Sequence, residues 1–335
     1  MMFMKKIFML AAACMTLFSC GKETPEGKND DNKREFDAWI QENHPGIEPT
    51  ALGSYILEET PGTGAPAADS AYLRVEVTSR YLDGTVYTTT SEQVARQVGS
   101  YFSSPTAYFG PVFWYRSGNS LYAGLEELVS GMNVGGSMTA VIPGWLNTFK
   151  RYSSAAGYLK NVKGTNLIYS FKIVEAFNDA EAWELDSLSR YMQAAYPDAE
   201  QDTTLAGFWF VPLEEGDESV DMDSASGLYI NYTGRRLDGK VFDTTIKDTA
   251  TVAGLVKASS SFGKKSIGWN SDYSKITMGG STVVDGFAYG ISKLRPGGKA
   301  LCFFYSGLGY KNSGSGSAIP AFCPLCFELE MTQNE

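Results

Sequence analysis

The chain has 335 residues, a formal net charge of −10, 43% apolar residues and a single histidine, His44. The negative charge, without a cluster of lysines and arginines, argues against a nucleic-acid partner, because phosphate binding requires grouped cations. One histidine cannot supply a histidine-rich metal site, and no nucleophile-elbow motif accompanies it, so a Ser-His-Asp hydrolase is not indicated. The apolar content is sufficient for two cores of ordinary size.

The N-terminus predicts export and lipid attachment. Two lysines precede an apolar run, residues 7–18, that is too short to span a bilayer and is typical of a signal peptide. The run ends in Leu17-Phe-Ser-Cys20-Gly, which resembles the lipobox of bacterial lipoproteins. The resemblance implies a signal peptide over residues 1–19 and a diacylated Cys20 that anchors a cell-envelope protein to the outer membrane. The alternative is an ordinary secretory signal with an incidental cysteine.

Residues 20–33 have almost no apolar content and are interpreted as a flexible tether. A helix is expected next, because Phe36, Trp39 and Ile40 occur at helical spacing. An aromatic strand follows over residues 53–57.

The body of the chain contains two versions of one domain. Residues 73–90 and 228–245 both alternate apolar and polar side chains and then turn through Leu-Asp-Gly, which predicts a β-hairpin in each. The duplication extends further, since Gly135-Gly136 matches Gly297-Gly298 and Phe171 matches Phe327. The second copy has its own leading helix, with a capping box at Asn178-Asp-Ala-Glu181. We therefore place a boundary near Phe177 and predict domains over 34–177 and 178–335.

The cysteines and glycine-rich loops do not indicate a cofactor site. Cys323-Pro-Leu-Cys326 has the spacing of a redox pair, but the surrounding alternation predicts a strand, so we expect half-buried thiols or one bridge to Cys302. Asp221-Met-Asp223 lacks the spacing of a calcium loop, and the run 311–317 lacks the ending of a phosphate-binding loop. No metal ion and no cofactor are predicted.

Six short motifs occur in order in the second copy. They are Tyr232-Thr-Gly234, Val241-Phe-Asp-Thr-Thr245, Val283-Val-Asp-Gly-Phe287, Pro296-Gly-Gly298, Gly309-Tyr310 and Ala318-Ile-Pro320, before a closing strand over 325–329. This series resembles the FKBP-type peptidyl-prolyl cis/trans isomerase family over roughly residues 226–331. The resemblance implies an α+β fold in which an antiparallel sheet curls around one short helix. With the duplication, it predicts two tandem FKBP-like domains, each with an extra N-terminal helix.

The resemblance also implies where the pocket lies. Its catalytic positions fall on seven residues: Tyr232, Phe242, Asp243, Val284, Phe287, Tyr310 and Phe327. Val283 and Ile319 would bind the substrate. Asp243 would be a buried carboxylate, the backbone N–H of Val284 would donate to a substrate carbonyl, and Phe287 stands where the family usually has tryptophan.

The first copy lacks this set of residues. Val77 takes the place of Tyr232, Tyr87-Thr88 that of Phe242-Asp243, and Leu125 that of Phe287, while no Gly-Tyr pair equivalent to Gly309-Tyr310 is identified after Pro143. Activity is therefore expected only in the second domain.

The predicted function is a prolyl isomerase or folding factor that acts on Pro-containing polypeptides in the cell envelope. Rotation about an X-Pro bond faces ~18–20 kcal/mol because the amide is conjugated. A dry aromatic pocket can favour the twisted amide without a nucleophile or general base. Two alternatives stay open, because aromatic residues at strand spacing are usually core residues. The protein could be a non-catalytic chaperone or scaffold for Pro-containing segments, or a structural subunit of an outer-membrane assembly.

Overall fold

A computed structural model describes residues 29–333 of the chain. The expected signal peptide, the lipidation residue Cys20 and most of the expected tether lie outside these residues. Helix α1 begins at Asp30, so the last four residues assigned to the tether are helical. Two acidic residues, Asp30 and Asp31, favour the helix N-terminus there, and the Asn29 amide donates to the Leu159 carbonyl oxygen at 2.7 Å.

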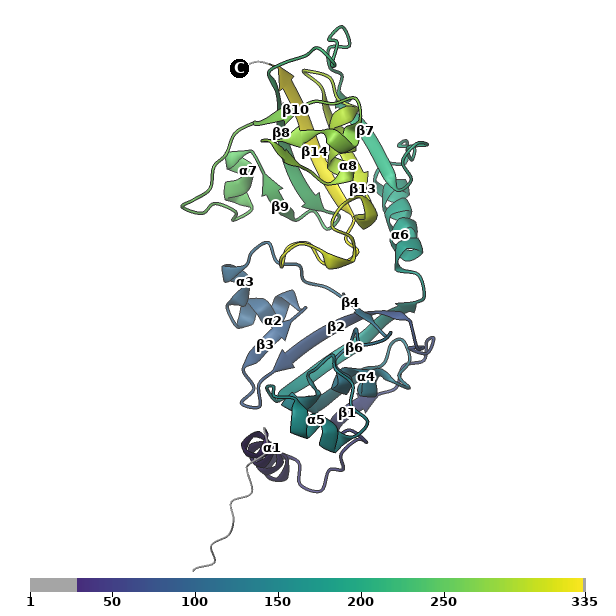
Figure 1. Cartoon of the computed structure of the whole chain (residues 1–335), viewed down its shortest axis with the longest axis vertical. Coiled ribbons are helices and arrows are strands. Elements are labelled where there is room, and N and C mark those ends of the chain that lie inside the picture. Colours follow the sequence, from purple (N-terminus) through teal and green to yellow (C-terminus); the bar gives the residue numbers. More distant parts are fainter. Residues whose placement is uncertain (1–28, 334–335) are drawn as a thin grey trace, which may run out of the picture.

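The first half of the described chain forms a six-stranded antiparallel sheet with strand order β1-β5-β6-β2-β3, in which β4 also pairs with β2. A short helix, α4, packs on the inner face of this sheet, and α1 precedes it (Figure 1). The elements are α1 (Asp30–Asn43), β1 (Tyr55–Thr60), β2 (Tyr72–Arg80), β3 (Val86–Thr89), α2 (Glu92–Gln97), α3 (Ser100–Ser103), β4 (Val112–Tyr115), α4 (Ala123–Val129), β5 (Ser137–Ile142), α5 (Ala155–Asn161) and β6 (Leu167–Phe177).

The second half forms an eight-stranded sheet with strand order β12-β11-β10-β8-β14-β13-β7, in which β9 also pairs with β8. The elements are α6 (Ala180–Ala195), β7 (Phe208–Glu214), β8 (Leu228–Arg236), β9 (Val241–Thr244), α7 (Lys247–Val252), β10 (Lys265–Gly268), β11 (Thr277–Met278), β12 (Ser281–Thr282), α8 (Asp285–Ser292), β13 (Lys299–Phe304) and β14 (Leu325–Gln333). Within residues 29–333, no helix has the length and apolar character that crossing a membrane requires.

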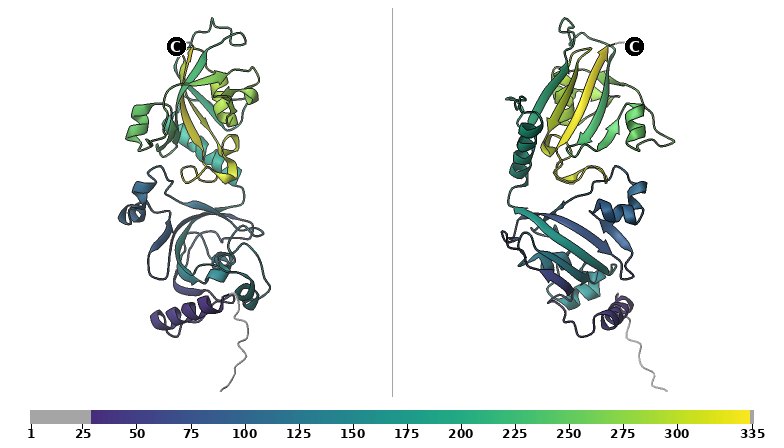
Figure 2. Two further views of the ribbon diagram at one scale, coloured as in Figure 1. Left: turned by 60° about the vertical axis from the view of Figure 1, so that its left-hand side comes forward. Right: turned by 180° about the vertical axis from the view of Figure 1, so that it is seen from behind.

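The two sheets have one topology. Strands β7-β13-β14-β8 repeat the order β1-β5-β6-β2, and β9 and β10 flank β8 as β3 and β4 flank β2. The two halves lie end to end, each with its own curled sheet and its own short helix (Figure 2). The predicted α+β architecture of two tandem domains, each preceded by an extra helix, is confirmed.

The strand register identifies equivalent positions in the two halves. Thr78 pairs with Thr89 in the first hairpin as Thr233 pairs with Thr244 in the second. In each hairpin the register then shifts one residue further along, after Ser79 in the first and after Gly234 in the second. This register supports the predicted correspondence of Val77 with Tyr232.

The predicted match of Phe171 with Phe327 is wrong by two residues. Gly234, the residue opposite Phe327, corresponds to Ser79, and Ser79 lies opposite Tyr169. Tyr169 is therefore the counterpart of Phe327. Residues 169 and 171 point to the same face of β6, so alternation of apolar residues alone cannot choose between them.

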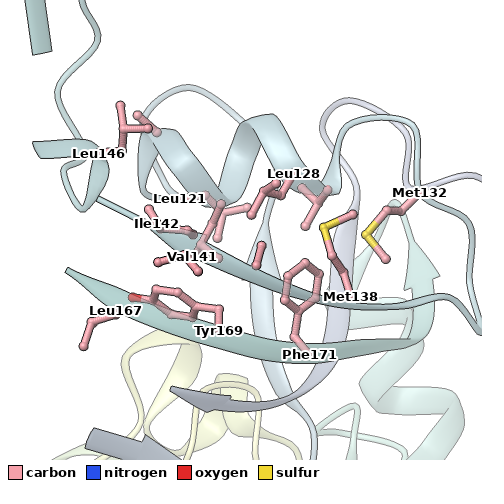
Figure 3. Close-up of a cluster of buried hydrophobic side chains, with 14 of the residues drawn as sticks. Leu121, Leu128, Met132, Met138, Val141, Ile142, Leu146, Leu167, Tyr169 and Phe171 are labelled. Atoms are coloured by element: carbon pink, nitrogen blue, oxygen red, sulfur yellow. The ribbon is translucent and has the colours of Figure 1, made fainter. Parts of the chain in front are cut away.

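Each half has its own buried core. In the first, Met138, Tyr169 and Phe171 on β5 and β6 lie beneath α4, whose Leu128 points toward them (Figure 3). In the second, α8 packs on the curled sheet through Phe287 and Ile291. The outer face of this sheet is covered by α6, whose Leu188 and Met192 form a further buried cluster with Trp209, Phe303 and Cys326.

Candidate active site

The second domain contains a cavity between α8 and the curled sheet. Its volume is about 420 Å³, and it is lined by Tyr232, Phe242, Asp243, Met278, Thr282, Val283, Val284, Phe287, Tyr310 and Phe327. Eight of these ten residues were assigned to a pocket from the sequence. They come from β8, β9, β14, the N-terminus of α8 and the loop after β13, so the fold gathers residues that are far apart in the chain.

Aromatic rings form the floor and one wall of the cavity. The buried ring of Phe287 lies 5.3 Å from the Tyr232 ring and 4.9 Å from the Phe327 ring, and both contacts are edge-to-face. Phe242 meets Phe327 at 5.5 Å, also edge-to-face. Such geometry is favourable for aromatic pairs beyond the area they bury, and it fixes the shape of the cavity.

Gly234 on β8 makes this ring arrangement possible. A Cβ atom at this position would lie 2.7 Å from a ring carbon of Phe242 and 2.7 Å from a ring carbon of Phe327. Any other residue would therefore push the two rings away from the strand. The first domain has Ser79 here, and its hydroxyl instead lies 2.9 Å from the hydroxyl of Thr88.

Two polar groups face each other at the mouth of the cavity. The hydroxyl of Tyr232 donates to Oδ2 of Asp243 at 2.7 Å. Burial raises the pKa of Tyr232, and the hydrogen bond to Asp243 raises it further, so the phenol stays protonated at neutral pH. Burial also raises the pKa of Tyr310, and the negative charge of Asp243 adds to this shift. Both phenols are thus held as hydrogen-bond donors.

The expectation that Asp243 is a buried carboxylate is wrong, because its side chain is exposed. It lies on β9, which among the described strands pairs only with β8 and therefore forms an edge of the sheet. The carboxylate thus reaches the cavity from its open rim while remaining in contact with solvent.

The N-terminus of α8 supplies a backbone donor. Val284 is the N-cap residue, and its carbonyl oxygen accepts from the Ala288 N–H at 3.0 Å. Within residues 29–333, no backbone or side-chain acceptor bonds the N–H of Val284 itself. Val283 and Val284 are half-buried and line the cavity, so a backbone donor without an acceptor among the described residues lies beside it.

Ile319, assigned to substrate binding, does not line the cavity. Its side chain is buried in the core cluster of the second domain. Two lining residues, Met278 and Thr282, were missed. They belong to the β11–β12 hairpin, whose turn residues Gly279 and Gly280 both have positive φ. A Gly-Gly pair between two short strands is itself a hairpin signal, and it could have identified this part of the cavity lining from the sequence.

The first domain places different side chains at the equivalent positions. Tyr87, the counterpart of Phe242, is 54% exposed and packs on Tyr81 outside the sheet. Gly124 on α4 lies close to Ile142, the last residue of β5, and Gly286 on α8 lies close to Phe304, the last residue of β13. The two glycines are therefore equivalent, which supports the match of the residues that follow them, Leu125 and Phe287. Val77 and Thr88, at the positions of Tyr232 and Asp243, cannot form the hydrogen bond found in the second domain.

The three cysteines of the described chain are free and buried. Burial raises the pKa of both Cys323 and Cys326 to about 12, and it raises that of Cys302 as well. The second cysteine of the CxxC sequence lies in strand β14, where no helix N-terminus stabilises a thiolate. The geometry fits structural thiols.

A family model covers the part of the chain that contains this cavity. Residues 220–332 match the model of the FKBP-type peptidyl-prolyl cis-trans isomerase family. Among solved structures, FkpA from Escherichia coli is 19% identical with a TM-score of 0.30, and the alignment covers 46% of this chain and 59% of that one. The chain thus spans less than two thirds of the length of FkpA.

Two further structures are similar. The three FKBP domains of wheat FKBP73 are 15% identical with a TM-score of 0.27, and the alignment covers 84% of this chain and 94% of that one. A peptidyl-prolyl cis-trans isomerase from Pseudomonas syringae pv. tomato is 21% identical with a TM-score of 0.30, over 46% of this chain and 94% of that one. On the family match and the cavity described above, residues 220–332 belong to the FKBP-type peptidyl-prolyl cis-trans isomerase family.

Proposed function

We propose that the second domain catalyses cis/trans isomerisation of X-Pro bonds in polypeptides and acts as a folding factor of the bacterial cell envelope. The observation that carries the proposal is the hydrogen bond from Tyr232 to Asp243 at the rim of an aromatic cavity. A volume of about 420 Å³ lies within the range of about 300–1,000 Å³ typical of small-ligand sites, and a prolyl residue with its neighbours fits such a space.

The site lowers the rotational barrier by binding the twisted amide better than the planar one. Twisting breaks the conjugation that gives the X-Pro bond its barrier of ~18–20 kcal/mol, and it leaves a less polar amide. The rings of Phe242, Phe287 and Phe327 surround the proline with apolar surface, which favours this species. The Val284 N–H holds the substrate carbonyl, and no group has to give or take a proton.

The experiment uses residues that the strand register makes equivalent. Asp243 pairs with Gly234 in the second domain as Thr88 pairs with Ser79 in the first. In the whole protein, we expect Asp243→Ala to lower kcat/KM for a Pro-containing tetrapeptide by about tenfold, which is about 1.4 kcal/mol. Thr88→Ala should leave it unchanged. Equal losses in the two variants would contradict the assignment of activity to the second domain.

Separated domains extend this test. A fragment of residues 178–335 should retain isomerase activity, and one of residues 34–177 should have none although it folds. Activity in both fragments would mean that the first domain has a site of its own.

A non-catalytic chaperone or scaffold is the second candidate. It is favoured by Phe287, which offers a smaller floor than the indole that the family usually has and no N–H donor. Under this alternative, the whole protein would bind a Pro-containing peptide in the cavity, and Phe287→Ala would weaken binding, but no turnover would be measured.

The cellular location is part of the proposal and rests on the sequence around Cys20. An acyl chain contributes about 0.8 kcal/mol per buried CH₂ to membrane binding, so two or more chains would hold the protein at a membrane. Mass spectrometry should show a mature N-terminus at acylated Cys20. Cys20→Ala protein should leave the membrane fraction, and its full retention there would rule out the lipid anchor.

A further inference from the structure

Exposed apolar side chains gather where the two domains face each other. Of nine large hydrophobic residues exposed in the described chain, five lie in the segments 98–102 and 246–256. Val252 is 91% exposed and Phe102 is 73% exposed. Their helices, α3 in the first domain and α7 in the second, lie on the same side of the molecule in each view (Figures 1 and 2). Large exposed apolar side chains on segments that face each other make this region a candidate interaction site.

A cleft separates these helices. Its volume is about 800 Å³, and both domains contribute to its lining, which is Tyr101, Pro105, Arg235, Gly239, Lys240, Val241, Asp248, Thr249, Val252, Ala253 and Gly254. Two cationic side chains and one carboxylate stand among the apolar residues. The lining therefore suits a polypeptide, which offers both apolar side chains and backbone carbonyl groups.

Buried polar contacts between the domains fix the walls of the cleft. Arg236, which is only 3% exposed, donates from Nη1 to the carbonyl oxygens of Thr106 at 2.9 Å and Ala318 at 2.7 Å. The Tyr108 N–H donates to the Ser317 carbonyl oxygen at 2.8 Å. Because the bond from Arg236 to Thr106 and the bond from Tyr108 to Ser317 join the two domains, the cleft is present before a ligand binds, and less ordering is required on binding.

Lys240 makes a second link across the cleft. Its Nζ lies 5.0 Å from the centre of the Tyr101 ring and 3.7 Å from Oε2 of Glu92, both in the first domain. Cation–π contacts of this kind are modest individually, but here they hold one lining residue of each domain together.

Strand β9 connects the cleft with the isomerase cavity. Val241 lines the cleft, and its neighbour Phe242 lines the cavity, because successive side chains of a strand point to opposite faces. A polypeptide whose proline occupies the cavity continues beyond it at about 3.3 Å per residue, so a few further residues would bring it around the edge strand to the cleft.

We propose that this inter-domain cleft is a second client site, which binds an apolar stretch of the same unfolded, Pro-containing polypeptide that the cavity acts on. The proposal rests on the proposed isomerase function for the identity of the client. The first domain, in which the pocket residues are replaced, would then have a role of its own, because it supplies one wall of the cleft. Short peptides would reach only the cavity, whereas long chains would occupy both sites.

The test compares variants on and off the cleft in the whole two-domain protein. Val252→Ser removes an exposed apolar side chain of the cleft lining, and Phe102→Ser removes one whose ring packs on the lining residue Tyr101. Phe149→Ser and Leu213→Ser are controls of similar type, 52% and 48% exposed, that neither line the cleft nor pack on Tyr101. The probes are fluorescently labelled, reduced and carboxymethylated α-lactalbumin, which stays unfolded, and a Pro-containing tetrapeptide. The measurements are the Kd of the first by anisotropy and kcat/KM for the second.

We expect the Phe102→Ser, Val252→Ser double variant to raise the Kd for the unfolded chain by about tenfold and to leave tetrapeptide turnover unchanged, with both controls like wild type. An unchanged Kd, or an equal rise in the controls, would overturn the proposal. Sedimentation equilibrium provides a further test. If wild type is a dimer, and the double variant is a monomer with an unchanged Kd for the unfolded chain, the proposal is also overturned, because a second copy of the protein would then cover the surface. If wild type does not turn over the tetrapeptide, the isomerase assignment fails, while the Kd comparison still decides whether the cleft binds a polypeptide.

Discussion

The hydroxyl of Tyr232 donates to Oδ2 of Asp243 across 2.7 Å, and this bond joins β8 to the edge strand β9 at the open side of the cavity. The same two positions in the first domain hold Val77 and Thr88, which cannot form it. This side-chain pair is thus one difference between two hairpins that share one register and one irregularity.

Breaking this pair should affect turnover more than stability. Tyr232→Phe keeps the ring packed against Phe287 and Phe327 but removes the donor, so we expect kcat/KM to fall about tenfold. The free energy of unfolding should change by about 1 kcal/mol, the value of one hydrogen bond. Asp243→Asn retains an acceptor and should lose less activity than Asp243→Ala. Unchanged turnover in Tyr232→Phe would show that the bond has no part in catalysis.

Gly234→Ser would import the first domain's residue into the second. Its Cβ would lie 2.7 Å from ring carbons of Phe242 and Phe327, so both rings must move. Overpacking of this kind costs about 1–3 kcal/mol, and we expect that loss in urea unfolding together with a collapse of tetrapeptide turnover. The reverse change, Ser79→Gly in the first domain, should leave turnover at the wild-type value. A fully active Gly234→Ser protein would refute the role of this glycine.

Much of the fold and part of the site could be predicted from the sequence. The Leu-Asp-Gly turns fix the hairpins, because turn residues with positive φ at Gly84 and Gly239 leave little choice of register. The register of β6 could not be predicted, since alternation with a period of two places Tyr169 and Phe171 on one face. The exposure of Asp243 depends on β9 being an edge strand, which is a property of the whole sheet.

The free thiols should be unreactive in the folded protein. Burial raises the pKa of Cys323 and Cys326 to about 12, so almost no thiolate exists at pH 8. We expect iodoacetamide to modify them at least a hundredfold more slowly than after denaturation in guanidinium, as followed by mass spectrometry of the peptide that carries both. The protein should not reduce insulin. Rapid insulin reduction that is lost in Cys323→Ser would contradict the structural interpretation.

Glu184 on α6 is a buried carboxyl that ties the extra helix to the segment leading to Tyr310. Its two oxygens accept from the N–H and the hydroxyl of Ser306, each at 2.5 Å. Burial raises the pKa of Glu184 to about 7, and the hydrogen bonds from Ser306 offset only part of that shift. The folded protein therefore holds a proton on this residue over a pH range in which the unfolded chain has lost it.

This linkage predicts a stability change between pH 5 and pH 8. Because the pKa is raised on folding from 4.5 to about 7, the contribution of Glu184 is full below pH 4.5 and is lost as pH rises through 7. The loss amounts to about 3 kcal/mol at most. Glu184→Gln removes the titration while its amide can still accept from the Ser306 N–H and donate to the hydroxyl. Urea unfolding at pH 5 and pH 8 should show that wild type loses more stability than this variant over that interval. Asp186→Asn, at an exposed position on the same helix, should behave like wild type. Parallel pH profiles for wild type and Glu184→Gln would show that the Glu184 carboxyl does not titrate in this range.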